Sequence, residues 1–124
     1  MPPGKVYQNI YVRLNTNAFS APYYIFSYEP NGQALNSATS NLVLYTDHWY
    51  KFIRTDTGHP FAIRVGDNIN SLTTIPGSGI IENQELKYET GLSIKKMEYY
   101  CTAHASMKSM IDVREIIKIK TGSS

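Results

Sequence analysis

The sequence contains a single cysteine, Cys101, so no disulfide can form within the chain. It has no apolar run close to the roughly 20 residues that a membrane-spanning helix needs. Its formal net charge is only +2, from 12 basic and 10 acidic residues, which is too small to indicate binding to nucleic acid or to an anionic membrane. These absences exclude a disulfide scaffold, a membrane span and a nucleic-acid-binding surface as interpretations.

The N-terminal segment also lacks the pattern of a secretory signal. Residues 1–7 read Met-Pro-Pro-Gly-Lys-Val-Tyr, without a charged region followed by an apolar one. We therefore expect either the mature form of an exported protein, which would be periplasmic or otherwise extracytoplasmic, or a protein that is not exported by that route.

The composition is that of a small globular protein. The 124 residues are enough for one domain with its own core, and 42% of them are apolar and 18% charged. We predict a single domain over residues 1–124. Ten residues are tyrosines, which fit a half-buried pleated surface and favour β structure.

Apolar and polar residues alternate with a period of two in most segments, which indicates strands. A segment rich in glycine and proline, residues 71–79, is predicted to be a loop, and single helical turns are expected near residues 103–110 and 35–40. Seven or eight short, evenly spaced strands predict an all-β fold, either a sandwich or a barrel. The predicted strands are residues 6–14, 23–28, 41–45, 49–54, 59–65, 85–88, 97–101 and 113–120.

Three potential metal donors lie within seven positions, at and after the predicted strand 97–101. They are the thiol of Cys101, the imidazole of His104 and the thioether of Met107. A thiolate and a thioether are soft donors, imidazole suits copper, and two histidines with one cysteine and a long axial methionine hold copper in both oxidation states. Because three donors come from one loop, one histidine from a neighbouring strand would complete the set.

His59 is the candidate for that fourth ligand. It follows Gly58 and precedes Pro60 and Phe61. Proline fixes its own φ and removes a backbone donor, which stiffens the approach of His59, and we expect Phe61 to pack beneath the site and exclude water. Met110 is a second thioether, so these residues leave the choice of axial donor open.

Together these motifs resemble the cupredoxin (blue copper) family. The Cys-x-x-His-x-x-Met spacing is similar to that of the short-loop amicyanin type, and the resemblance extends over residues 41–113. The residues that carry it are Gly58-His59-Pro60-Phe61, the run Tyr99-Tyr100-Cys101-Thr102-Ala103-His104-Ala105-Ser106-Met107-Lys108, and Trp49-Tyr50-Lys51-Phe52, which resembles the strand before the first ligand.

This resemblance implies a Greek-key β-sandwich that binds one type 1 copper ion through His59, Cys101 and His104, with Met107 as the axial ligand. It implies an electron carrier rather than an enzyme, with an unidentified redox partner protein and the ring edge of His104 as the exit for the electron. The chain departs from the family in its lack of a visible export signal and in having Lys108-Ser109-Met110 where a glycine often follows.

The same pattern is loosely similar to cupredoxin-like modules in structural or surface proteins of marine bacteria and phages. On that alternative the domain is a subunit of a virion or a surface array, its partners are copies of itself or other structural proteins, and the metal site is vestigial or structural. Residues 6–14 and 113–120 would then each pair with, or lie against, a neighbouring chain.

Each candidate ligand also has an ordinary structural interpretation. Cys101 can be a small buried hydrophobe and Met107 core filler, and both histidines can be hydrogen-bonded strand or loop residues. A Cys-His hydrolase would need an orienting group and an oxyanion hole, which no motif supports. A structural zinc site usually has more thiolates and does not use methionine. The copper interpretation predicts that both histidine rings lie on the order of 4 Å from the Cys101 sulfur.

Overall fold

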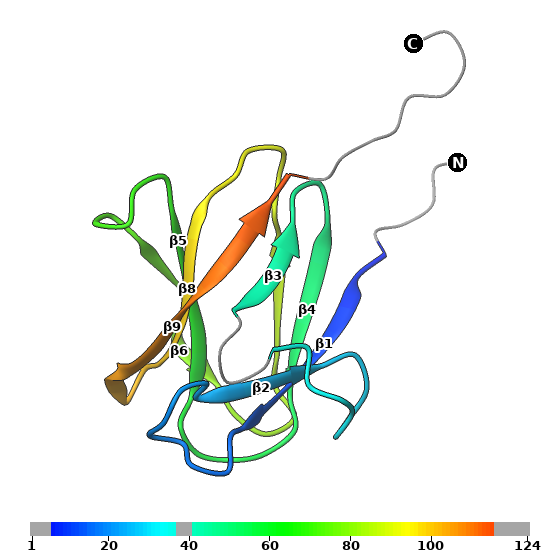
Figure 1. Ribbon diagram of the computed structural model, residues 1–124, viewed down its shortest axis with the longest axis vertical. Coiled ribbons are helices and arrows are strands. Elements are labelled where there is room, and N and C mark those ends of the chain that lie inside the picture. Colours follow the sequence, from blue (N-terminus) through cyan, green and yellow to red (C-terminus); the bar gives the residue numbers. More distant parts are fainter. Residues whose placement is uncertain (1–5, 37–40, 116–124) are drawn as a thin grey trace, which may run out of the picture.

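The computed structural model of the protein describes residues 6–36 and 41–115. Within these residues the chain forms nine β-strands and no α-helix. The strands make two sheets that face each other across a common core (Figure 1). The all-β sandwich predicted from the sequence is therefore confirmed.

The first sheet has the strand order β2-β1-β4-β7, and β1 lies parallel to β4 and antiparallel to β2. The second sheet has the order β3-β9-β8-β5-β6. The first sheet contains β1 (Gln8–Leu14), β2 (Tyr24–Ser27), β4 (Trp49–Arg54) and β7 (Glu85–Glu89). The second contains β3 (Leu42–Tyr45), β5 (Phe61–Gly66), β6 (Thr73–Ile80), β8 (Lys96–Cys101) and β9 (His104–Arg114).

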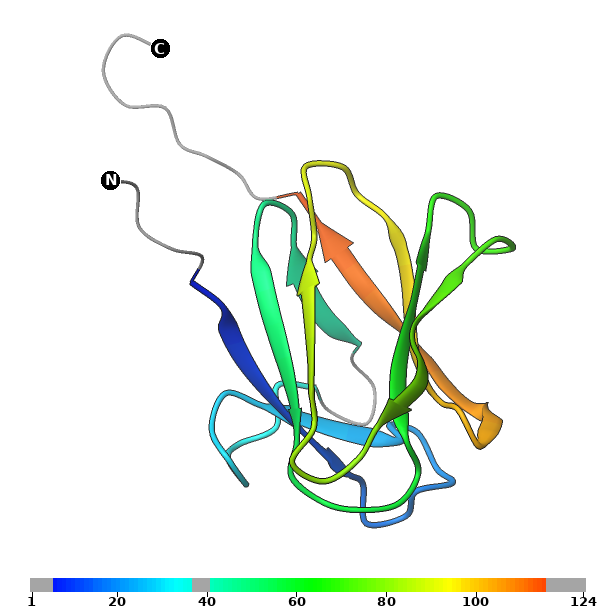
Figure 2. The same cartoon turned by 180° about the vertical axis from the view of Figure 1, so that it is seen from behind.

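The chain passes repeatedly from one sheet to the other. The β1–β2, β4–β5 and β8–β9 connections all lie in the lower part of the sandwich in both views (Figures 1 and 2). Segments that are about 40 residues apart in the sequence thus become neighbours at one end of the fold.

Aromatic rings from both sheets fill the space between them. The ring centroids of Tyr24 and Phe61 are 5.1 Å apart, and those of Phe26 and Tyr99 are 5.0 Å apart, both edge to face. Phe52 completes this cluster, and none of the five side chains is more than 1% exposed. Burying one such ring stabilises the fold by about 1.5–3 kcal/mol, so this cluster is a main support of the end that carries Phe61.

The central strand β8 is buried on both of its faces. Its inward face joins the core, whereas Glu98 and Tyr100 on the outward face are covered by Arg64. The Arg64 guanidinium lies 3.8 Å from the centre of the Tyr100 ring and 2.9 Å from the Glu98 carboxylate. Because side chains alternate along a strand, the residues between and beside Glu98 and Tyr100 face the core. These residues are Met97, Tyr99 and Cys101.

Two local predictions are wrong. Residues 73–79 of the predicted loop 71–79 belong to β6, which pairs with β5, and a register shift between Phe61 and Ile63 accommodates the irregular sequence; residues 71–72 lie outside the strand. Residues 104–110 form no helical turn, because they belong to β9, in which Met107 and Ile111 face the core; residue 103 lies in the turn before the strand.

Two further sequence predictions fall partly outside the described residues. No helical turn is present at residues 35–36, and residues 37–40 of that prediction are not described. The predicted last strand, residues 113–120, is described only to residue 115, and β9 ends at Arg114.

The pairing of strands does not support the virion or surface-array alternative. β1 lies between β2 and β4, and β9 lies between β3 and β8. A strand that is hydrogen-bonded on both sides has no free edge for a neighbouring chain. In β1, residues 11–12 are paired on both sides, whereas residues 8–10 pair only with β4, and residues 113–114 of β9 pair only with β3. The alternative is therefore not supported for the doubly paired residues and stays a prediction for the others. The edge strands of the described sheets are β2, β7, β3 and β6.

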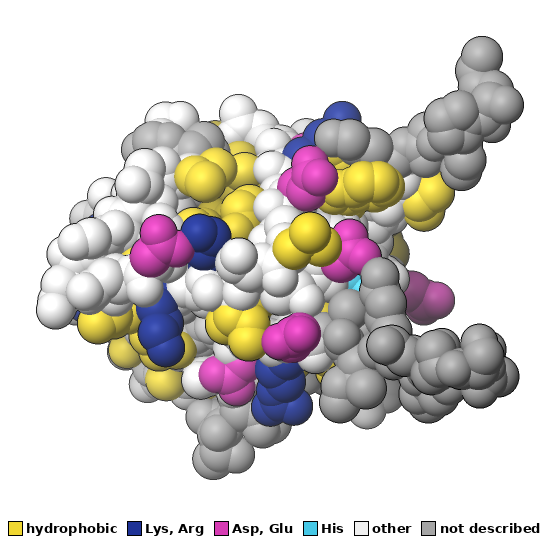
Figure 3. All heavy atoms as spheres, turned by 90° about the horizontal axis from the view of Figure 1, so that it is seen from above, with side chains coloured by type: hydrophobic (Ala, Val, Ile, Leu, Met, Phe, Trp, Pro, Cys, Tyr) yellow, Lys and Arg dark blue, Asp and Glu magenta, His cyan; other side chains and the backbone are white. Residues whose placement is uncertain are grey.

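The upper end of the sandwich carries charges of both signs. Figure 3 shows basic and acidic side chains interspersed with hydrophobic ones there, without a block of one sign. The Lys95 ammonium, for example, is paired with the Asp67 carboxylate across two loops. The described part of the chain holds no helix with the length and apolar character that crossing a membrane requires.

Candidate metal centre

Strand pairing places three of the predicted ligands at one end of the second sheet. Cys101 ends β8 and His104 begins β9, and the two residues are paired across a tight turn. On the other side of β8, Phe61 at the start of β5 pairs with Cys101. His59 precedes Phe61 by two residues, so the same register brings the β4–β5 connection beside the cysteine. The three residues therefore meet because β8 is hydrogen-bonded to β5 on one side and to β9 on the other.

The side chains of these three residues converge. The Sγ atom of Cys101 lies 3.8 Å from Nδ1 of His59 and 3.8 Å from Nδ1 of His104. One donor atom from each of the three residues lies within 4.8 Å of the other two, and the two imidazole centroids are 5.1 Å apart. Donor atoms that each lie about 2.0–2.3 Å from a shared ion are separated by roughly 3–4.5 Å. The three donors are therefore spaced to hold one metal ion.

Burial differs sharply among the three. Cys101 is 0% exposed, His59 is partly buried and His104 is exposed. The thiol is thus closed to solvent, while the His104 ring forms the surface of the site.

Phe19, from the β1–β2 connection, covers both histidines, and the sequence analysis did not single it out. Its ring lies edge-on to His59 and to His104, with centroid distances of 5.3 Å and 5.5 Å, although Phe19 itself is 64% exposed. Nothing in its local sequence marks it, because it lies 40 residues before His59 and reaches the site only through the sandwich fold.

The two methionines lie on opposite faces of β9. Met107 is 1% exposed and belongs to the same core cluster as Cys101. Met110 is 37% exposed and is paired with Glu98 on the outward face of the sheet. Because side chains alternate along a strand, Met110 points away from the core. Of these two candidates, Met107 is consequently the one on the side of the cysteine.

Tyr24 lies beneath the centre and bonds to its backbone. Its hydroxyl donates a hydrogen bond of 2.6 Å to the His59 carbonyl oxygen. The pKa of Tyr24 is raised well above its ordinary value, mainly because the residue is buried and secondly because the Cys101 side chain lies nearby. The hydroxyl therefore stays protonated, and remains a donor, throughout the neutral pH range.

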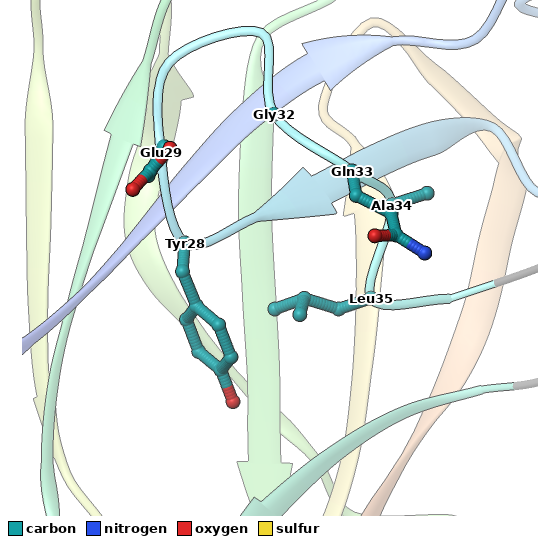
Figure 4. A pocket seen from close by; sticks show the side chains of 6 residues that line it. All are labelled: Tyr28, Glu29, Gly32, Gln33, Ala34 and Leu35. Atoms are coloured by element: carbon teal, nitrogen blue, oxygen red, sulfur yellow. The ribbon is translucent and has the colours of Figure 1, made fainter.

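A separate hollow of about 480 Å³ lies beside the turn after β2 (Figure 4). Its lining contains none of the candidate ligands, and Figure 4 shows the Tyr28 and Leu35 side chains lying side by side at it. The lining residues are Tyr28, Glu29, Gly32, Gln33, Ala34 and Leu35. This hollow is therefore not part of the cysteine–histidine cluster.

No family model matches the sequence, and no curated protein matches it significantly. Similar solved structures include the reduced Cu(I) form of an amicyanin variant, at 11% identity over 91% of this chain and 85% of that chain, with a TM-score of 0.48. A purple cupredoxin from Nitrosopumilus maritimus is 13% identical over 85% of this chain and 97% of that chain, with a TM-score of 0.49. A rusticyanin variant is 10% identical over 85% of this chain and 76% of that chain, with a TM-score of 0.46.

These likenesses are weak, with identities of 10–13% and TM-scores below 0.5. The function of the chain is therefore inferred from the side chains of its own site.

Proposed function

We propose that the protein binds one copper ion through Nδ1 of His59, Sγ of Cys101 and Nδ1 of His104, with Met107 as the axial donor, and that it acts as an electron carrier. The observation that carries this proposal is the placement of both imidazole nitrogens 3.8 Å from one buried thiol. Bound copper would supply one-electron chemistry by cycling between its two oxidation states.

The donor set favours copper over zinc. Two imidazoles, one thiolate and a nearby thioether match the ligands of a mononuclear copper electron-transfer site. A structural zinc site is usually closed by four nitrogen, sulfur or carboxylate donors and does not use methionine. Among the described residues, the group of possible His, Cys and carboxylate ligands here contains three members, His59, Cys101 and His104.

The surrounding chain suits electron transfer better than substrate chemistry. Cys101 is closed to solvent, so a substrate has no access to it as a nucleophile, and its thiol is protected from oxidation. The two ligand segments are joined by a hydrogen bond of 3.0 Å from the Thr102 amide to the Pro60 carbonyl. These rigid supports would keep the ligands in place in both oxidation states, and the exposed ring of His104 would face a redox partner protein.

Copper titration of the purified protein tests the proposal. A bond between a thiolate and Cu(II) gives an intense visible charge-transfer band, so we expect colour that saturates at one equivalent of Cu(II). Cys101→Ser should abolish this band. His48→Gln is the matched control. His48 is the one histidine of the chain outside the proposed ligand set, and its ring stacks on Tyr50.

The electron-carrier role is tested by voltammetry of the copper-loaded protein, which should show a reversible one-electron wave. A wild-type protein that stays colourless with Cu(II) and fails to withdraw Cu(I) from a chelator contradicts the proposed function. A strongly coloured Cys101→Ser variant contradicts the ligand assignment.

A further inference from the structure

His59 has an unusual backbone conformation. Its φ is +46°, in the left-handed region, and the preceding Gly58 has a φ of +78°. Glycine adopts such a φ freely, but histidine does so at a cost. Pro60 adds to this cost, because a residue before proline is restricted toward extended conformations with negative φ. A strained residue of this kind persists only where its surroundings hold it in place.

The side chain of Arg54 provides that hold from inside the protein. Arg54 ends β4 and is 0% exposed. Its Nη1 donates to the carbonyl oxygens of His59 and Ile80, at 2.9 Å and 3.1 Å, and its Nη2 donates to the Gly58 carbonyl oxygen at 2.7 Å. One guanidinium therefore binds the carbonyl oxygens of both residues with a left-handed φ, Gly58 and His59.

The guanidinium is itself fixed and its charge is paired. The Asp56 carboxylate lies 3.0 Å from both Nε and Nη2 of Arg54, and its second oxygen accepts a bond of 2.8 Å from the Leu14 amide. The guanidinium thus makes four hydrogen bonds, one from Nε to Asp56 and three to backbone carbonyls, and Nη2 also forms an ion pair with Asp56. A buried cation is tolerated when it is paired and hydrogen-bonded in this way.

Tyr24 gives the His59 carbonyl a second donor. Its hydroxyl bonds to that oxygen at 2.6 Å, and its ring lies 5.6 Å from Cζ of Arg54. Arg54 and Tyr24 come from β4 and β2 of the first sheet, whereas Cys101 belongs to the second. The two side chains thus tie the backbone of one candidate ligand to the sheet opposite the other two.

We propose that Arg54 is a positioning residue of the metal centre, which holds the strained backbone of His59 so that its ring lies beside Cys101 before any metal binds. This inference rests on the proposed function. Arginine suits the role because its planar fork reaches three carbonyl oxygens at once, whereas the single ammonium of lysine has no such fixed geometry. Groups that orient a ligand in this way change metal affinity about 10–100-fold when they are replaced.

Arg54→Lys, which keeps the charge but loses the fork, tests this role. Arg13→Lys is the matched control, because Arg13 also donates to a loop carbonyl, that of Gly32, and to the Ser27 hydroxyl, away from the site. The first measurement uses the metal-free protein, in which cross-relaxation between the ring protons of His59 and His104 reports their contact. We expect this signal in the wild type and in Arg13→Lys, and its loss in Arg54→Lys.

The second measurement is the affinity of each folded variant for Cu(I), determined by competition with a chelator. We expect Arg54→Lys to bind Cu(I) about 10–100-fold more weakly, and Arg13→Lys to match the wild type. Tyr24→Phe removes the other donor to the His59 carbonyl and should weaken binding in the same direction. If Arg54→Lys does not fold, Tyr24→Phe decides the question by the same two measurements.

A folded Arg54→Lys that keeps both the ring contact and the wild-type affinity overturns the inference, since a merely structural arginine would change stability alone. The ring contact is measured without metal. A wild-type protein that binds no copper therefore contradicts the proposed function, while the ring contact in Arg54→Lys still judges the positioning role.

Discussion

Gly79 lies where the two ligand-bearing segments pass each other, and Gly79→Ala tests how closely they pack. Gly79 has a φ of +76°. A Cβ atom added there would lie 2.7 Å from Cβ and 3.0 Å from the carbonyl carbon of Pro60, and 3.1 Å from Oγ1 of Thr102. Pro60 follows His59 and Thr102 follows Cys101, so the close contacts involve the chain neighbours of two candidate ligands.

Two costs add at this position. A left-handed φ costs an L-residue about 1–2 kcal/mol. Overpacking against a rigid neighbour costs about 1–3 kcal/mol more, and Pro60 is rigid because its ring restricts the backbone. We therefore expect Gly79→Ala to lower the free energy of unfolding by about 2–5 kcal/mol, and to weaken copper binding by displacing Pro60.

Gly91→Ala separates the two costs. Gly91 has a φ of +69°, but a Cβ added there meets nothing within 4 Å. The Gly91→Ala variant should lose only the backbone contribution, about 1–2 kcal/mol of the free energy of unfolding. It should keep the wild-type affinity for copper. Denaturant unfolding of both metal-free variants, followed by Cu(I) competition, measures the difference. If Gly79→Ala is no less stable than Gly91→Ala and binds copper equally well, the close packing at Pro60 is refuted.

Three other predictions concern the site and its support. Met107→Leu should keep copper binding but raise the reduction potential, because a weak axial donor is lost; an unchanged potential in voltammetry would rule out Met107 as the axial donor. Phe19→Ala should speed the removal of copper by a chelator with little effect on stability, since Phe19 is 64% exposed yet covers both histidine rings; an unchanged rate would mean that the ring shields nothing. Stability should also fall above pH about 10, where tyrosines of the unfolded chain ionise. Burial raises the pKa of Tyr24 and Tyr99 in the fold, so their contribution is complete below that pH and is lost as the pH rises. Tyr24→Phe should make the alkaline loss shallower by up to about 1.4 kcal/mol per pH unit, and an unchanged slope in denaturant unfolding at several pH values would contradict this.

Most of the strands could be predicted from the sequence alone. β4 has the predicted bounds, and β1, β2, β3, β7 and β8 differ from the predicted ranges by at most two residues at either end. In these segments the period of two, or a short apolar run, and the flanking turn residues act locally, so neighbouring strands are not needed to recognise them. The pairing of Cys101 with His104 is local in the same sense, because a two-residue turn joins them.

β6 and β9 required the tertiary structure. The proline and glycines of residues 71–79 are typical of a loop, but pairing with β5 overrides that preference and tolerates the left-handed φ of Gly79. The residues after Cys101 show no clear period, and hydrogen bonds to β3 and β8 make them a strand. Only that assignment separates the inward Met107 from the outward Met110.

One part of the candidate site could likewise be predicted from the sequence, whereas another part required the tertiary structure. Residue chemistry and spacing were enough to select His59, Cys101 and His104 as possible partners. The register between β5 and β8 then decided that His59 lies beside the thiol. Phe19 and Arg54 carry no sequence signal of their role, because each reaches His59 through a contact that depends on how a distant loop or a buried side chain packs. Periodicity encodes which residues form a strand, whereas contacts between segments are set by the packing of the whole sandwich.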